Sequence, residues 1–275
     1  MVCRRLGLLL WACALCGFAQ FINPAPGFAK DRGADGKFED RQSAHFILYQ
    51  DVEIDQHSGL YGSDRFEREV LKVLEEAYDT VLKDLGWRPL RRVTVVIYDD
   101  QVFDEKFAGL FRFSAAGFYE GVIRVRGRTR VDGRLIRVLH HEYLHAALDA
   151  EAGGTRVPGW VNEGVAEYFE RSSVGIDSLH SQERAYLRQA VGNSAWMPLS
   201  ALSSPSFSQM SPEGASLAYL EAYAMVQHIV DHYGKRKLKA VLRDLLRSGD
   251  LDRALQRNLS RDLDELEAAL IAELF

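Results

Sequence analysis

Cysteine is scarce in this 275-residue chain, and the three that occur, Cys3, Cys13 and Cys16, all lie close to the N-terminus. A domain that follows them has no disulfide and no thiolate ligands for a cysteine-rich structural zinc site. An excess of positive charge is also lacking, since 34 lysines and arginines stand against 39 acids and give a net charge of −5. We therefore expect no nucleic-acid partner that is recruited by overall positive charge.

A long apolar run is also missing. The stretch Leu6–Ala19 follows two arginines and is too short for a comfortable transmembrane helix. Small residues occupy the −3 and −1 positions of a cleavage site after Ala19, so we predict a signal peptide over residues 1–19. The mature chain is then expected to be secreted or periplasmic, with no membrane span. An uncleaved anchor and a lipoprotein acceptor at Cys13 are the alternatives.

The rest of the chain has the composition of a globular domain, with 47% hydrophobic and 27% charged residues. Residues 20–43 combine proline and glycine with mixed charges, which predicts a linker or arm. Residues 44–275 are predicted to form one domain. Its first part, 44–133, favours strands, and its second part, 134–275, favours helices. Strands followed by helices are typical of an α+β fold.

Individual elements can be predicted from spacing. Apolar and β-branched stretches predict strands at 45–49, at 92–98 and, with a bend at Gly121, at 117–126. A helix is expected from Asp64 to Leu85, opened by a capping box of Asp64 and Glu67. Three-to-four spacing of apolar residues predicts later helices near 134–151, 160–171, 179–191, 215–233, 235–247 and 262–274.

The clearest chemical signal is HEYLH in the predicted helix 134–151. His141 and His145 are four residues apart, so both imidazoles leave one face of a helix about one turn apart. Two neutral imidazoles in this arrangement can bind one Zn²⁺ at about 2.0–2.1 Å. Glu142 lies beside the first histidine, where a carboxylate can take a proton from a water bound to the metal. An amphipathic helix with surface histidines is the alternative.

The next predicted helix offers a third ligand. It reads WVNEGVAEYF over residues 160–169 and follows a glycine-rich turn that lets it fold back on the first. A catalytic zinc site has three protein ligands and one open position, so Glu163 can complete a set of two histidines and one carboxylate. Glu167, one turn later, can accept a hydrogen bond from the far nitrogen of a ligand histidine. Gly164 would permit close packing of the helix beside the metal. A solvated acidic face is the alternative.

HEYLH followed by WVNEGVAEY resembles the gluzincin metallopeptidases, especially the small peptidase MA-like family. The similarity is firm over residues 135–170 and looser over 215–247, and thermolysin and the aminopeptidase-N type are more distant. The resemblance implies one zinc ion and these roles: His141, His145 and Glu163 as ligands, Glu142 as the general base, and Glu167 as hydrogen-bond partner of a ligand. It also implies a gluzincin-like fold, with a small mixed sheet before a helical subdomain.

The resemblance further implies a tyrosine on a later helix that stabilises the oxyanion of the transition state. Tyr219 matches that position best, and Tyr223 lies one turn further along the same face. His228 and His232 are more distant candidates. These side chains can also simply pack the helix against the core.

Departures from related families narrow the prediction. Metzincins need a glycine and a third histidine shortly after the motif, where this chain has Leu148 and Glu151. The Gly-x-Met-Glu-Asn segment of aminopeptidases is absent, and the nearest stretch is GFYEG at 117–121. Gluzincins place the edge strand that pairs with extended substrate before the zinc helix, where 117–126 lies in this chain. We therefore expect an endopeptidase or an enzyme with a narrow special substrate.

The sequence thus predicts a zinc metallopeptidase that hydrolyses a peptide or protein substrate outside the cytoplasm. Two alternatives remain open. One is a catalytically silent peptidase-like binding protein of the cell envelope. The other is a scaffold that holds a structural zinc or no metal.

Overall fold

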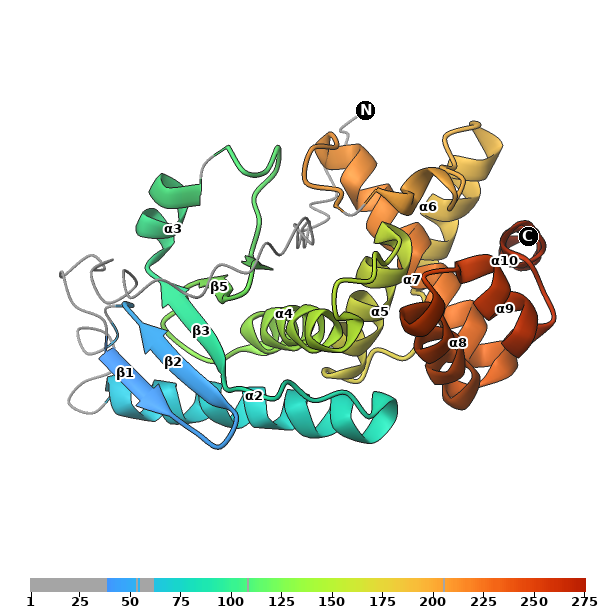
Figure 1. The fold of residues 1–275 in the computed structure, drawn as a ribbon. Coiled ribbons are helices and arrows are strands. Elements are labelled where there is room, and N and C mark those ends of the chain that lie inside the picture. The colour runs from blue at the N-terminus through green and yellow to red at the C-terminus, as the bar shows by residue number, and fades with distance from the viewer. Residues whose placement is uncertain (1–38, 53, 55–61, 108, 205) are drawn as a thin grey trace, which may run out of the picture.

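The computed structural model describes residues 39–275 except 53, 55–61, 108 and 205 (Figure 1). The predicted signal peptide and most of the predicted arm lie outside the described residues. Within the described part, none of the helices combines the length and the apolar character needed to cross a bilayer.

The strands of the described chain form one mixed sheet in the order β1-β2-β3-β5-β4. The middle strands run parallel to one another, and both edge strands are antiparallel to their neighbours. The strands are β1 (Glu39–Gln42), β2 (Phe46–Gln50), β3 (Val93–Tyr98), β4 (Gly117–Tyr119) and β5 (Ile123–Arg126). The edge strand β4 directly precedes β5, and the turn between them contains Gly121 with φ of +69°.

The two faces of the sheet are covered by different helices. Alternate residues of β3 point to opposite faces, and all from Val95 to Tyr98 are buried because both faces are covered. Val95 and Ile97 belong to the main core with helices α2 (Gly62–Leu85) and α4 (Gly133–Ala152). Val96 and Tyr98 belong to a smaller aromatic cluster with α3 (Asp100–Phe107).

Helices make up the rest of the domain (Figure 1). Figure 1 shows α4 in the centre, between the sheet and the helices of the C-terminal half, and α5 packs against both α4 and α7. The helices after α4 are α5 (Gly159–Ser172), α6 (Ser181–Gly192), the 3₁₀ turn η2 (Ala201–Ser203), α7 (Pro212–Tyr233), α8 (Lys235–Ser248), α9 (Leu251–Leu259) and α10 (Leu263–Leu274).

The predicted α+β class is confirmed, and each predicted strand and helix has a counterpart within a few residues. Four elements of the described chain were not predicted, namely β1, α3, the 3₁₀ turn η2 and α9. Since β1 occupies residues 39–42, the end of the predicted linker or arm is part of the sheet. The predicted capping box was wrong, because α2 begins at Gly62 and Asp64 lies inside the helix. Its carboxylate instead pairs with Arg41 of β1.

Candidate metal centre

Helix α4 carries the HEYLH motif in the interior of the protein. The Asp132 side chain caps the helix by accepting hydrogen bonds from the backbone N–H groups of Arg134 (3.1 Å) and Leu135 (3.0 Å). The helix ends at Gly153, whose φ of 55° is left-handed. Every residue from 138 to 148 is buried, because α4 packs between the sheet, α2 and α5. The motif therefore does not lie on a surface helix.

Two glycines allow helix α5 to lie close to neighbouring segments of the chain. A Cβ on Gly159 would lie 1.9 Å from the carbonyl oxygen of Ser204, and a Cβ on Gly164 would lie 2.4 Å from that of Ala222 in α7. No larger residue fits at either place without moving backbone. The sequence predicted close packing at Gly164, and the structure identifies α7 as the helix that approaches there.

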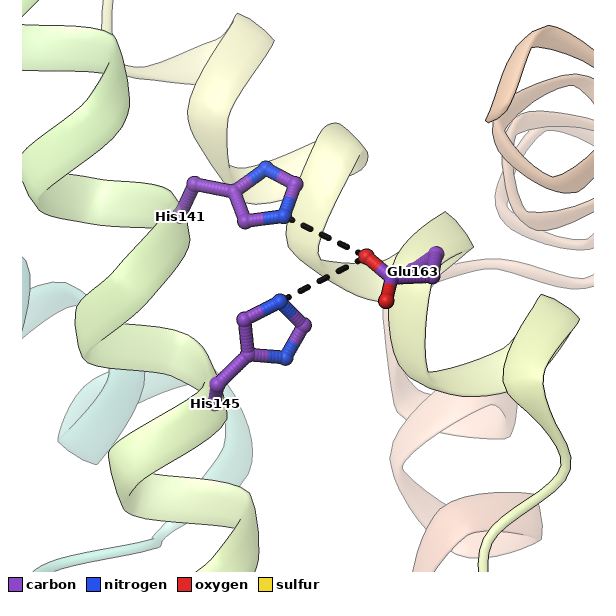
Figure 2. A group of neighbouring side chains, drawn as sticks. All are labelled: His141, His145 and Glu163. Atoms are coloured by element: carbon purple, nitrogen blue, oxygen red, sulfur yellow. Dashed lines mark ion pairs between the residues drawn. The ribbon is translucent and has the colours of Figure 1, made fainter. Parts of the chain in front are cut away.

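The two helices bring the three predicted ligands together (Figure 2). Oε2 of Glu163 lies 3.5 Å from Nε2 of His141 and 3.5 Å from Nε2 of His145. All three residues are buried. In Figure 2 both imidazoles, one helical turn apart on α4, point at the same carboxylate oxygen on α5.

This arrangement fits a zinc ion. Donor atoms about 2.0–2.1 Å from a tetrahedral Zn²⁺ are separated from one another by about 3.3–3.4 Å, close to the two observed separations. Nε2 of His145 and Oε2 of Glu163 are buried and make no hydrogen bond within the described part of the chain. Buried polar atoms are normally satisfied, and a cation shared by these donors would satisfy both.

The far nitrogens of both imidazoles have acceptors of their own. Nδ1 of His141 lies 2.6 Å from Oε2 of Glu170, whose other oxygen pairs with Arg137 at 2.6 Å. Nδ1 of His145 lies 2.9 Å from Oδ1 of Asn162. A proton on each Nδ1 leaves the Nε2 lone pair facing Glu163, which is the tautomer that a metal ligand needs.

These contacts correct one prediction. Glu167 was expected to orient a ligand histidine, but its carboxylate accepts a hydrogen bond from Nε of Arg171 at 3.1 Å. Glu170, seven residues after Glu163, accepts the hydrogen bond that was expected for Glu167. Along an α-helix, seven residues bring a side chain back to within about 20° of the starting direction, whereas four residues rotate it about 40° too far. Glu170 therefore lies two turns from Glu163 on nearly the same line. Asn162 could have been noticed as the polar neighbour of Glu163, but spacing alone does not single it out.

The pKa of Glu163 is set by its burial and by the two imidazoles beside it. Burial raises the pKa of Glu163, but the imidazoles of His145 and His141 more than offset this and hold the pKa below its usual range. The lowered pKa favours the ionised form of Glu163, which is the form that binds a metal.

The other two acids of α5, Glu170 and Glu167, have pKa values that are shifted in opposite directions. Burial raises the pKa of Glu170, but the hydrogen bond from His141 and the charge of Arg137 outweigh it and lower the pKa. The pKa of Glu167 is instead raised to about 7, first by burial and then by the charge of Glu170, although Arg171 opposes this. One carboxylate of the pair is thus the ionised acceptor for the histidine, while its neighbour retains a proton more readily.

Glu142 lies at the junction of α4 and the edge strand β4. Its side chain is fully buried. A Cβ on Gly117, the first residue of β4, would lie 3.0 Å from Oε1 of Glu142 and 2.9 Å from Cγ1 of Val138. The missing side chain at Gly117 therefore makes room for the predicted base between helix and strand.

Comparison with known proteins places the chain in a family. A family model described as the Peptidase MA superfamily matches residues 76–274. The chain belongs to the Peptidase MA superfamily. It is also similar to a protein of Bacillus subtilis (strain 168) named "Uncharacterized protein YhcO", with 20% identity over 287 aligned positions that cover 97% of this chain and 82% of the relative. The matched range contains both helices of the candidate metal centre.

Of the tyrosines considered as oxyanion donors in this Peptidase MA chain, Tyr223 makes contacts with other side chains. Its hydroxyl donates to Gln227 at 3.2 Å, the guanidinium of Arg171 lies 4.1 Å from its ring centroid, and burial raises its pKa to about 12. Tyr219 is buried one turn earlier on α7, with its ring packed edge-on to Phe207 at 5.2 Å. Its role in stabilising an oxyanion stays a prediction.

Proposed function

We propose that this protein is a gluzincin-like zinc endopeptidase that acts outside the cytoplasm. The observation that carries the proposal is the convergence of two imidazoles and one carboxylate, each histidine Nε2 lying 3.5 Å from the same oxygen of Glu163. Membership of the Peptidase MA superfamily supports peptidase chemistry. The location rests on the N-terminal sequence.

His141, His145 and Glu163 would hold Zn²⁺, with Glu170 and Asn162 fixing the two rings. Zinc in such a site polarises a carbonyl and lowers the pKa of a bound water. Glu142 takes the proton from the attacking water and passes it to the leaving amine. Two observations favour this role: Glu142 directly follows His141 on α4, and its carboxylate is buried beside β4. Tyr219 would donate a hydrogen bond to the oxyanion.

The substrate is proposed to be an extended peptide that pairs with β4. Among the described residues this strand lies at one edge of the sheet, and an outer edge can bind a peptide by main-chain hydrogen bonds. Its first residue, Gly117, lies against Glu142, so a peptide on this edge would pass close to the base. The lack of a recognisable amino-terminus-binding segment favours internal cleavage.

The proposal is tested by Glu142→Gln, with zinc content and hydrolysis of a diverse peptide library measured on the same preparation. We expect zinc to be retained and hydrolysis to fall by at least about 10²-fold. Glu151→Gln, an exposed acid at the end of α4, is the matched control and should leave both unchanged.

Two results would contradict the proposal. Unchanged hydrolysis with zinc retained would remove Glu142 from the mechanism. A zinc-loaded wild-type protein without turnover on any peptide would instead point to the catalytically silent binding protein of the cell envelope.

A further inference from the structure

A second group of histidines and an acid lies at the contact between α7 and the C-terminal helix α10. His228 and His232 are four residues apart on α7, as His141 and His145 are on α4, and their ring centroids are 4.5 Å apart. Glu273 of α10 completes the group. Each of its three residues offers a ligand atom within 4.8 Å of those of the other two.

The carboxylate of Glu273 presents one oxygen to each imidazole. Oε2 lies 3.1 Å from Nδ1 of His228, and Oε1 lies 2.6 Å from Nε2 of His232. The His228 side chain is only 4% exposed, whereas those of His232 and Glu273 are 50% and 40% exposed. One member of the group is therefore fixed in the interior and the other two are reached by solvent.

We propose that His228, His232 and Glu273 form a second zinc site, distinct from the centre between α4 and α5. Two imidazoles and a carboxylate are a donor set that suits Zn²⁺, and exposure lets water complete the coordination. Each imidazole nitrogen is 0.2–0.7 Å closer to its own oxygen of Glu273 than the roughly 3.3 Å expected between two ligand atoms of tetrahedral zinc. The exposed side chains of His232 and Glu273 can open by that much. His228 supplies a ligand whose position is already set.

Metal at this site would tie the last helix to the helix that supports α5. Helix α10 packs against α6 and α7, and its Glu267 accepts hydrogen bonds from the indole of Trp196 and the backbone N–H of Leu199, both at 2.9 Å. A zinc ion between α7 and α10 therefore stabilises a contact that organises the loop between α6 and α7. The effect is on stability and does not require catalysis.

The test uses untagged full-length protein in which the first centre is removed by His141→Ala and His145→Ala. Titration with ZnCl₂, followed by calorimetry, should show one equivalent bound. Adding His232→Ala or Glu273→Gln should weaken this binding by at least about 10-fold, because each removes one of three ligands. His180→Ala, which removes another exposed histidine, is the control and should leave the binding unchanged.

A second measurement covers the case in which the background variant does not fold. In the otherwise intact protein, replacing His232 by alanine should lower the zinc bound at a free zinc concentration near the wild-type Kd of this site, whatever the first centre holds. It should also reduce the rise of the melting temperature on adding ZnCl₂ by at least about 3–5 °C at a hundredfold excess over the wild-type Kd. Equal zinc content and equal thermal shifts with and without His232 would overturn the proposal.

Discussion

Glu170 and His141 form the contact that links the candidate metal centre to the buried charges of α4 and α5. Oε2 of Glu170 lies 2.6 Å from Nδ1 of His141, while the other oxygen lies 2.6 Å from Arg137. The pair is fully buried, so the orientation of the imidazole depends on an ionised carboxylate that is itself held by a guanidinium.

Replacing Glu170 by glutamine should therefore weaken zinc binding by about 10–100-fold, because the neutral amide is a poorer acceptor for His141 and leaves Arg137 without its counter-ion. The affinity can be measured by competition with a chelator of known strength. Glu167→Gln is the matched control on the same helix, and its effect should be clearly smaller. A larger loss from Glu167→Gln would show that the expectation drawn from the sequence was right after all.

The grouping of His141, His145 and Glu163 could be predicted from the sequence because helical periodicity fixes which side chains share a face. To predict that His141 and His145 lie together, it is enough to predict the helix that carries both. To place Glu163 beside them, it is enough to predict the turn that folds α5 back against α4. Glu170 and Arg137 depend on how far α5 is rotated and shifted against α4. That shift is set by packing at Gly159 and Gly164, which spacing does not encode.

The elements that were missed have different causes. Strand β1 reads EDRQ and has no apolar residue, so its pairing with β2 and the ion pairs of Arg41 hold it in place. Helix α3 has only eight residues and is stabilised by the aromatic cluster on the sheet. Helix α9 did carry a signal, since Asp250 caps a run with buried Leu255 and Leu259.

Gly164→Ala should destabilise the fold, because the new Cβ would lie 2.4 Å from a backbone oxygen of Ala222 that cannot move alone. We expect the free energy of unfolding to fall by about 1–3 kcal/mol, as for other overpacked sites. Gly192→Ala is the control, since a Cβ at the end of α6 meets nothing within 4 Å. Urea denaturation should show no loss for this control, and an equal effect of both substitutions would contradict the close approach of α5 and α7.

Glu221 on α7 should make stability depend on pH. Its pKa is raised to about 8, first by burial and also by the charge of Glu267, although a hydrogen bond from the backbone N–H of Met197 opposes this. In the unfolded chain the same acid titrates near 4.5. Between these values the folded protein keeps a proton that the unfolded chain releases, so the free energy of unfolding falls as pH rises.

The measurement compares urea unfolding of wild type and Glu221→Gln at pH 5 and pH 8. Between pH 5 and pH 8 the free energy of unfolding of the variant should rise, relative to that of the wild type, by on the order of 2–4 kcal/mol. Glu213→Gln replaces an exposed acid on the same helix and serves as the control. A stability difference between wild type and Glu221→Gln that does not change with pH would show that Glu221 keeps an ordinary pKa.

Gly117→Ala tests whether the edge strand positions the base. The new Cβ would lie 3.0 Å from Oε1 of Glu142 and 2.9 Å from Val138, so either β4 moves away from α4 or the carboxylate is displaced. A displacement of this size should lower kcat by about 10–100-fold, while the zinc ligands on α4 and α5 stay in place.

Zinc content and peptide hydrolysis measured together separate this effect from loss of the metal. Gly133→Ala, at the first residue of α4, adds a methyl group where nothing lies within 4 Å, and should change neither quantity. If Gly117→Ala hydrolysed peptides as fast as Gly133→Ala with equal zinc, the carboxylate of Glu142 would not need the room that Gly117 leaves. The strand would then have to be assigned to substrate binding alone.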